Sequence, residues 1–161
     1  MKKLKILVLT LLTSAAMIHK LHAAEATVSP NGFKSPQCTY GADMLTDSYG
    51  WTLKFSRSYG RDAYRWPSLI TNGTKTTNPQ ANDLMVLDAW SGSSLGHVGW
   101  VYDRDGDWIC VIHTNMRVGT DLVTYGRAKF RYAWFRDLGD GTVHCWDNGK
   151  TYPLKAFLTQ K

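Results

Sequence analysis

Short apolar segments separated by turn sequences fill the chain from Asp83 to Trp146, and this pattern constrains the fold most. Segments rich in β-branched and aromatic residues, bounded by Gly, Asp and Ser, are typical of strands. The predicted strands are 83–88, 96–102, 108–115, 130–137 and 142–146. Turn sequences occupy 91–94, 103–107 and 138–141, and the middle one carries an Asp-Gly pair typical of hairpins. Such short connections favour antiparallel pairing.

Two helices are predicted ahead of these strands. Residues 38–49 show apolar side chains at helical spacing, and a second helix is expected within 51–70, ending near Trp66-Pro67. Residues 71–82 are rich in Thr, Asn, Gly and Pro and are expected to form a surface loop. Helices followed by antiparallel strands predict an α+β domain, with N-terminal helices packed on one side of an antiparallel sheet.

The N-terminus has the layout of a secretory signal peptide. A lysine-rich start precedes an apolar run, residues 6–18, that is too short to span a bilayer. We therefore expect residues 1–24 to be removed, leaving a single domain at 25–161 in a secreted or periplasmic protein. No stable membrane association is expected once the signal is removed, because the rest of the chain has no other long apolar run.

The predicted signal peptide also accounts for most of the positive charge. Four of the 19 Lys and Arg residues lie in 1–24 and none of the 13 acids does, so 15 basic residues remain and the net charge falls from +6 to +2. Overall charge therefore gives no support to a nucleic-acid partner.

The chain contains three cysteines, Cys38, Cys110 and Cys145. Disulfides form in exported proteins, and an odd count leaves one thiol over. Cys110 and Cys145 both lie in predicted strands, so a bridge between them would leave Cys38 free. Two separate buried thiols are the alternative.

Cys38 lies where the first predicted helix begins. Free N–H groups and the helix dipole favour negative charge there, which makes a thiolate accessible near neutral pH. Such a cysteine is a candidate nucleophile if a base can reach it. It could instead be a small buried apolar residue or half of a disulfide.

A candidate base and a partner for it lie on the predicted hairpin. His97 begins one strand, while His113 and Asn115 share a face of the next because they are two residues apart. Pairing that is symmetric about Asp105 places His97 opposite His113. A register shift of two residues would bring Asn115 closer to His97 instead.

These residues suggest a Cys-His-polar site, in which a thiolate attacks a carbonyl and a third group orients the histidine. The Cys38 backbone N–H, aided by the Gln37 amide, would stabilise the oxyanion. Gln37 could equally cap the helix or face solvent. Trp90, on the loop before His97, is the best candidate for a flat substrate contact. No cofactor is predicted, and no metal site, because a zinc ligand set would have to include the nucleophile.

Four motifs occur in order: Gln37-Cys38-Thr39, Gly60-x-x-Ala63-x-x-Trp66, Asn82-Asp83-Leu84-Met85-Val86 and Gly96-His97-Val98-Gly99-Trp100-Val101. In these motifs the sequence resembles the CHAP family of cysteine amidohydrolases/peptidases, over about 35–115. The resemblance implies a papain-like fold and cleavage of amide bonds in bacterial peptidoglycan or related peptides. It also assigns the family's cysteine and histidine to Cys38 and His97.

The third member of the site departs from the family pattern. CHAP proteins commonly carry a glutamate followed two residues later by asparagine, whereas this chain has His113 and Asn115. A histidine in that place is similar to the related NlpC-type endopeptidases. We therefore expect His113 to orient His97, with Asn115 as a supporting or alternative member.

The sequence thus predicts an exported cysteine hydrolase that cleaves amide bonds in peptidoglycan. The alternative is an exported wall-binding or inhibitor module that keeps the fold without turnover.

Overall fold

The computed structural model describes residues 27–161, and the predicted signal peptide lies outside this range. The helical elements are α2 (Cys38–Ser48), the 3₁₀ turn η1 (Ala63–Arg65) and α3 (Trp66–Leu69). The strands are β1 (Gly73–Thr76), β2 (Leu84–Leu87), β3 (His97–Asp105), β4 (Trp108–His113), β5 (Thr120–Tyr125), β6 (Ala128–Asp137), β7 (Thr142–Cys145) and β8 (Thr151–Gln160). Within 27–161, no helix has the length and apolar character needed to cross a membrane.

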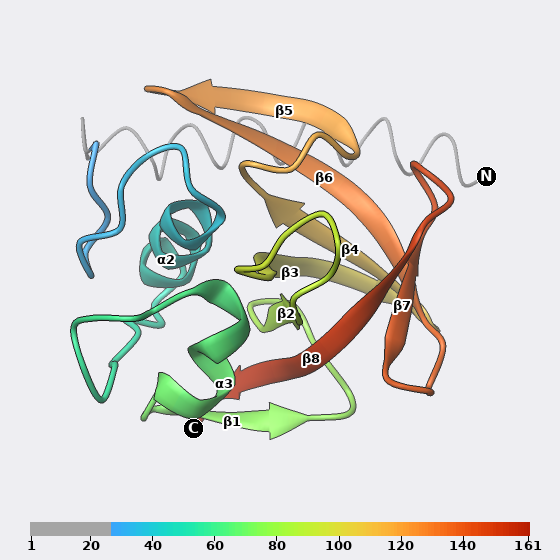
Figure 1. Cartoon of the computed structure of the whole chain (residues 1–161), viewed down its shortest axis with the longest axis horizontal. Helices are drawn as coiled ribbons and strands as arrows, with labels where there is room; N and C mark the ends of the chain where they lie inside the picture. Colours follow the sequence, from blue (N-terminus) through green and yellow to red (C-terminus); the bar gives the residue numbers. More distant parts are fainter. Residues whose placement is uncertain (1–26) are drawn as a thin grey trace.

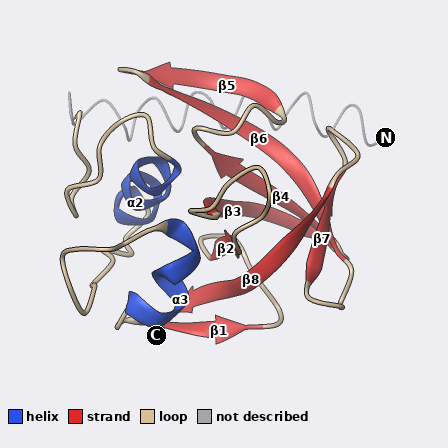
Figure 2. Cartoon of the chain, in the orientation of Figure 1, coloured by secondary structure: helices blue, strands red, loops and turns tan. Residues whose placement is uncertain are grey.

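The strands form a closed antiparallel barrel. Its order is β8, β2, β3, β4, β6 and β7, and β7 closes the ring because it pairs with both β6 and β8. β1 adds to the edge of β8, and β5 adds to the edge of β6 (Figure 1). The predicted α+β, papain-like fold, with helices layered on one sheet, is therefore wrong. Among residues 27–161 the fold is mostly β, with 44% strand and 13% helix, too little helix to form a layer (Figure 2).

Closure of the barrel depends on β8, a strand that local sequence patterns do not predict. β8 pairs with β7 through its first residues and with β2 and β1 through its later ones. Pro153 lies within it, opposite Thr142, and proline usually argues against a strand. The partners in β1 and β2 lie more than sixty residues earlier in the chain, so pairing is set by tertiary packing.

Two apolar clusters lie on the two faces of the barrel wall. One fills the barrel and includes Met85, Leu87, Val101, Val111, Ala133, Phe135, Val143 and Phe157. The other lies between the outer face and α2, and includes Tyr40, Leu45, Trp66, Val98, Trp100, Cys110 and Ile112. β3 and β4 are therefore buried on both faces over much of their length, which explains their continuous apolar sequences.

The loop before α2 is fixed by a buried carboxylate. Asp43 of α2 accepts hydrogen bonds from Ser29 Oγ at 2.6 Å, Asn31 N at 2.9 Å and Asn31 Nδ2 at 2.8 Å. Burial raises the Asp43 pKa, and these donors oppose the rise. Since leaving a buried donor unpaired costs about 1–3 kcal/mol, this network holds the chain in place just ahead of Cys38.

The second predicted helix does not form. Residues 51–55 run extended, with Trp51 and Leu53 buried and Thr52 and Lys54 exposed, a period of two that fits no helix. Only the single turns η1 and α3 follow. The expected loop at 71–82 is also partly wrong, since it contains β1.

The β3–β4 hairpin has a different register from the one predicted. Asp105 pairs with Trp108 across a two-residue turn, in which Gly106 takes a φ of 64°. The register then shifts by one between Val101 and Asp103. The predicted symmetry about Asp105 is therefore wrong, because the turn lies after that residue and a bulge follows.

All three cysteines are free thiols. Cys110 belongs to the outer cluster and Cys145 to the barrel interior, so the sheet itself separates the two side chains. The structure therefore favours two separate buried thiols over a bridge.

Candidate active site

The two histidines of the hairpin meet at one end of the barrel. His97 Nε2 lies 3.2 Å from His113 Nδ1, within hydrogen-bond range, and the residues are 4% and 1% exposed. His97 begins β3 and His113 ends β4, on the face that also carries Val101 and Val111. Because Val101 pairs with Val111, the histidines are offset along the hairpin, and the structure nevertheless brings together the predicted base and orienter.

Gly99 makes this close approach possible. A Cβ on Gly99 would lie 2.3 Å from Val111 Cγ1 and 3.2 Å from His113 Cβ. Any side chain there would push β3 away from β4 beside the histidine pair. There is therefore room only for glycine at this position, which follows Val98.

Both histidines are held in the neutral form. Burial lowers the His97 pKa well below its ordinary value, and the neighbouring His113 lowers it further. Burial likewise lowers the His113 pKa to about 4, with a further decrease from the charge of Arg131 and an opposing increase from the Val118 backbone. Near neutral pH the pair therefore consists of two uncharged imidazoles.

Cys38 is half-buried in the first turn of α2, with its sulfur against the start of β3. The backbone N–H of Val98, which follows His97, lies close enough to favour the thiolate, as do those of Thr39 and Cys38 itself. Burial outweighs these donors and raises the pKa of the thiol. The expected lowering by the helix terminus is therefore not the dominant effect, because packing against the outer cluster removes water from the sulfur.

Thr114 joins the cysteine helix to the histidine hairpin. Its Oγ1 donates to the Gln37 carbonyl at 2.8 Å, and Thr114 is fully buried. Gln37 immediately precedes Cys38, and Thr114 immediately follows His113. A Cβ on Gly41 would lie 2.6 Å from Thr114 Oγ1, so glycine permits this contact. Nothing in the sequence marks Thr114 or Gly41 as functional, except that each lies close to a predicted site residue.

The turn before His97 is packed against η1. Gly96 has a φ of 67°, and a Cβ there would lie 2.5 Å from the Leu87 carbonyl oxygen and 2.8 Å from Tyr64 Cβ. The Tyr64 N–H also donates to the Leu95 carbonyl at 3.2 Å. These contacts set the direction in which the chain enters β3 and thus the position of His97.

Three other predicted site residues lie differently. Asn115 is exposed with a φ of 59°, and within the described chain the ring that contacts His97 Nε2 is that of His113. The Gln37 side chain is exposed and does not cap α2. Trp90 is partly buried against the barrel cluster, with its ring 5.2 Å from that of Tyr152. Trp90 thus packs against the barrel.

Comparison with known proteins identifies the family. The CHAP domain model matches residues 28–115, a segment that contains the cysteine helix and both histidines. No curated protein matches the chain. Among solved structures, that of Ly7917 has a TM-score of 0.53 at 13% identity, covering 89% of this chain and 60% of that one. Ly7917 with the hydrolyzing product of MDP gives a TM-score of 0.53 at 14% identity, covering 91% and 62%.

The present chain therefore spans about three fifths of the length of these similar structures, which at this identity show the fold alone. The family match, in contrast, extends over more than half of the chain, and so the protein belongs to the CHAP domain family.

Proposed function

We propose that the protein is an exported cysteine hydrolase that cleaves an amide bond in peptidoglycan, with Cys38 as nucleophile, His97 as base and His113 as orienting group. The observation that carries the proposal is the 3.2 Å contact between the two imidazoles, beside a thiol that lies against the Val98 N–H. The similar structure of Ly7917 with the hydrolyzing product of MDP supports a wall-derived substrate.

The tautomers of the two rings follow from their neighbours. We assign the His113 proton to Nε2, because the Val118 backbone raises the His113 pKa as a nearby acceptor would, although Nε2 makes no hydrogen bond within residues 27–161. His113 Nδ1 is then an acceptor for a proton on His97 Nε2. This arrangement leaves the lone pair on His97 Nδ1, where it can accept the thiol proton. His113 thereby orients His97 without carrying charge.

The reaction begins with a neutral thiol and a neutral imidazole, as the pKa directions of Cys38 and His97 require. His97 accepts the thiol proton as the sulfur attacks the amide carbonyl carbon. N–H groups in the first turn of α2 stabilise the oxyanion. The imidazolium then protonates the departing amine, leaving a thioester on Cys38. His97 next deprotonates water, whose attack on the thioester releases the acid and restores the thiol.

The first prediction concerns the nucleophile. We expect Cys38→Ala to lower the release of amines or peptides from purified peptidoglycan by about 1000-fold or more, because no other group can form the thioester. Cys145→Ala is the matched control, since it removes a thiol from the barrel interior, and its folded fraction should retain activity. A Cys38→Ala protein that still releases these products contradicts the proposal.

One observation favours a second candidate, a wall-binding module without turnover. Burial raises the Cys38 pKa, so the resting thiol is a weak nucleophile until its proton is transferred. A protein that binds purified peptidoglycan equally well with Cys38 or Ala at this position, and releases no product in either form, supports this module over the hydrolase.

A further inference from the structure

One short segment accounts for the net charge of the domain. Residues 1–26 hold four of the 19 basic and one of the 13 acidic residues, so 27–161 carry 15 and 12, a net charge of +3. The basic segment, residues 54–65, contains Lys54, Arg57, Arg61, Arg65 and a single acid, Asp62, which also gives +3. The rest of the domain therefore has a net charge of zero, so the net charge of the domain equals that of this segment.

The basic segment lies between the two parts of the chain that supply the candidate active site. On one side, the Arg61 guanidinium carbon is 4.4 Å from the centre of the Phe33 ring, in the loop that leads to Cys38. On the other side, Tyr64 packs on Gly96, directly before His97. The basic segment thus contacts both the loop that leads to Cys38 and the residue before His97.

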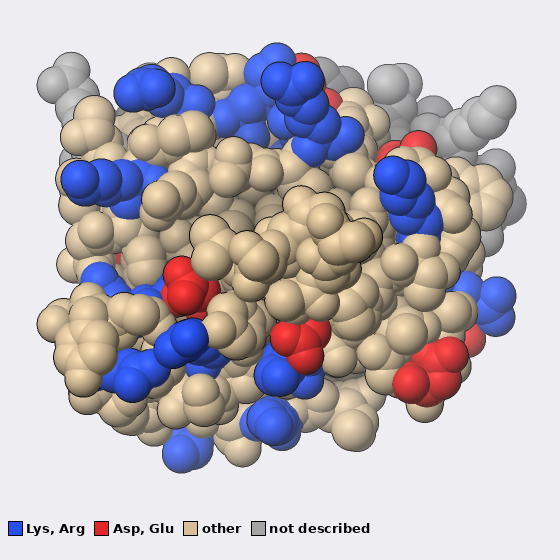
Figure 3. Space-filling model, in the orientation of Figure 1, with Lys and Arg blue, Asp and Glu red and all other residues tan. Residues whose placement is uncertain are grey.

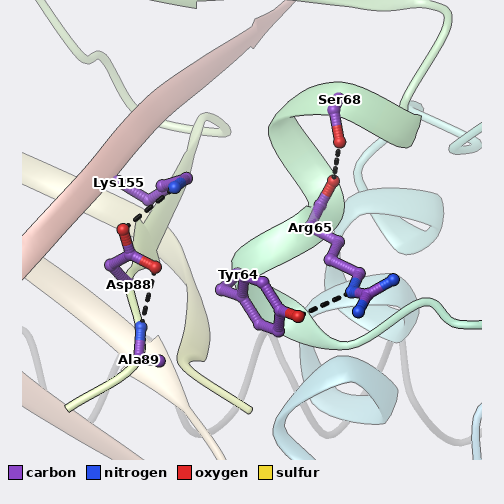
Figure 4. A network of polar contacts seen from close by, with 6 residues as sticks. All are labelled: Tyr64, Arg65, Ser68, Asp88, Ala89 and Lys155. Carbon is purple, nitrogen blue, oxygen red and sulfur yellow. Dashed lines mark hydrogen bonds and ion pairs between the residues drawn. The ribbon is translucent and has the colours of Figure 1, made fainter. Parts of the chain in front are cut away.

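Two guanidinium groups of this segment converge over Gly60. Arg57 Nη2 and Arg65 Nη1 each lie 3.7 Å from the position that a Cβ on Gly60 would occupy. Arg65 Nε donates to Tyr64 Oη at 2.7 Å, and Figure 4 shows the terminal nitrogens of Arg65 turned away from that ring. The Asp62 carboxylate is 3.7 Å from Arg65 Nε, and the buried Arg57 Nε has no hydrogen-bond partner within residues 27–161.

Two like charges at this range repel each other, and one carboxylate at the edge of the pair does not neutralise both. An anion over Gly60 would relieve the repulsion and accept hydrogen bonds from both groups. Planar guanidinium groups match a carboxylate, which they can bind through two parallel hydrogen bonds. In Figure 3, Lys and Arg side chains lie along the left, upper and lower margins of the face, and its middle carries few of them.

We propose that Arg57 and Arg65 form a binding site for a carboxylate of the peptidoglycan peptide, which anchors the substrate beside Cys38 and His97. This inference rests on the proposed function for the identity of the ligand. The site contributes affinity and selects substrates that carry a free carboxylate next to the bond to be cleaved. It takes no part in the chemical step.

The test measures binding, so that it does not depend on turnover. Cys38→Ala protein is sedimented with insoluble peptidoglycan and, in parallel, with the same material after its carboxylates have been converted to amides. We expect about tenfold tighter binding to the untreated material, as charge-assisted hydrogen bonds predict. Adding Arg57→Gln and Arg65→Gln should abolish this preference.

The matched control replaces two basic residues away from the segment, Arg136→Gln and Lys150→Gln, and should keep the preference. Arg136 lies near Asp107, at the opposite end of β3 from His97. Thermal unfolding checks that each variant folds, while the two peptidoglycan preparations test the unaltered arginines directly.

Equal binding to both preparations overturns the inference, as does a preference that persists in the Arg57→Gln/Arg65→Gln protein. Hydrolysis is measured separately with the wild-type protein. Absence of product there overturns the proposed function, while the difference in binding still decides whether the carboxylate site exists.

Discussion

His97 is the residue on which the proposed chemistry most depends, and its surroundings make it a weak base. Burial and the adjacent His113 both disfavour the imidazolium, and the lowered His113 pKa shows that the second ring shares this environment. The gain is that His97 stays neutral, and so able to accept a proton, at pH values where an exposed histidine would be charged.

The pH dependence of activity should reflect this burial. His97 accepts a proton only above its pKa, which lies well below 6.5, so kcat/KM should fall as pH decreases with a midpoint below 6.5. In His113→Gln the neighbouring ring no longer lowers the His97 pKa, so the midpoint should move to higher pH while the maximal rate falls.

The measurement is a pH–rate profile on peptidoglycan fragments, with circular dichroism at each pH to confirm folding. This check is needed because histidines with a lowered pKa destabilise the fold as pH falls below their unfolded value, about 6.5. A wild-type midpoint at or above 6.5, or a rate that still rises below about pH 5, contradicts the assignment.

At the scale of elements, the important contact is the one between α2 and the end of β4. The Thr114 hydroxyl and the Gln37 carbonyl connect residues 77 positions apart in sequence, next to the orienter and the nucleophile respectively. Small displacements of reacting groups lower rates strongly, so this hydrogen bond positions the thiol relative to the histidine pair.

We expect Thr114→Val to lower kcat by about tenfold with little change in KM, because it keeps the shape of the side chain but removes the hydroxyl. Thr114→Ser should restore much of the rate. Thr46→Val is the control, since Thr46 Oγ1 donates within α2 to the Ala42 carbonyl at 3.0 Å. Thr46→Val should lower the free energy of unfolding and leave kcat unchanged. If Thr114→Val and Thr46→Val give the same kcat, Thr114 has no positioning role.

At the scale of the whole molecule, stability depends on closing the barrel with the last strand. Phe157 of β8 is 2% exposed in the barrel interior, opposite Met85 of β2 and Thr76 of β1. It therefore packs where β8 meets two strands from a distant part of the chain.

Phe157→Ala should lower the free energy of unfolding by about 3–5 kcal/mol, because it leaves a cavity where the closing strand packs. Urea denaturation measures the change. Lys155→Ala on the same strand should change it by about 0.5 kcal/mol or less, since its ion pair with Asp88 is exposed. A loss below about 1 kcal/mol for Phe157→Ala would mean that β8 is not essential to the core.

Local patterns in the sequence determined the first helix, the strands near 84–87, 97–105, 108–113, 128–137 and 142–145, and the two histidines of the site. These depend on side-chain periodicity and turn residues within a few positions, and such signals are local. The family was predicted from motifs that contain Cys38 and His97 and that occur in the family's order.

Only the tertiary structure decided the rest. Closure by β8, the contact of Thr114 with Gln37 and the convergence of Arg57 and Arg65 all depend on packing that periodicity does not encode. The hairpin register shows the limit most clearly. The later turn and the one-residue bulge after Val101 together offset the strands by two residues from the predicted pairing. His97 still contacts His113, because side chains on one face of a sheet also meet their diagonal neighbours. Burial, likewise, decided that the Cys38 pKa rises, against the effect of the helix terminus.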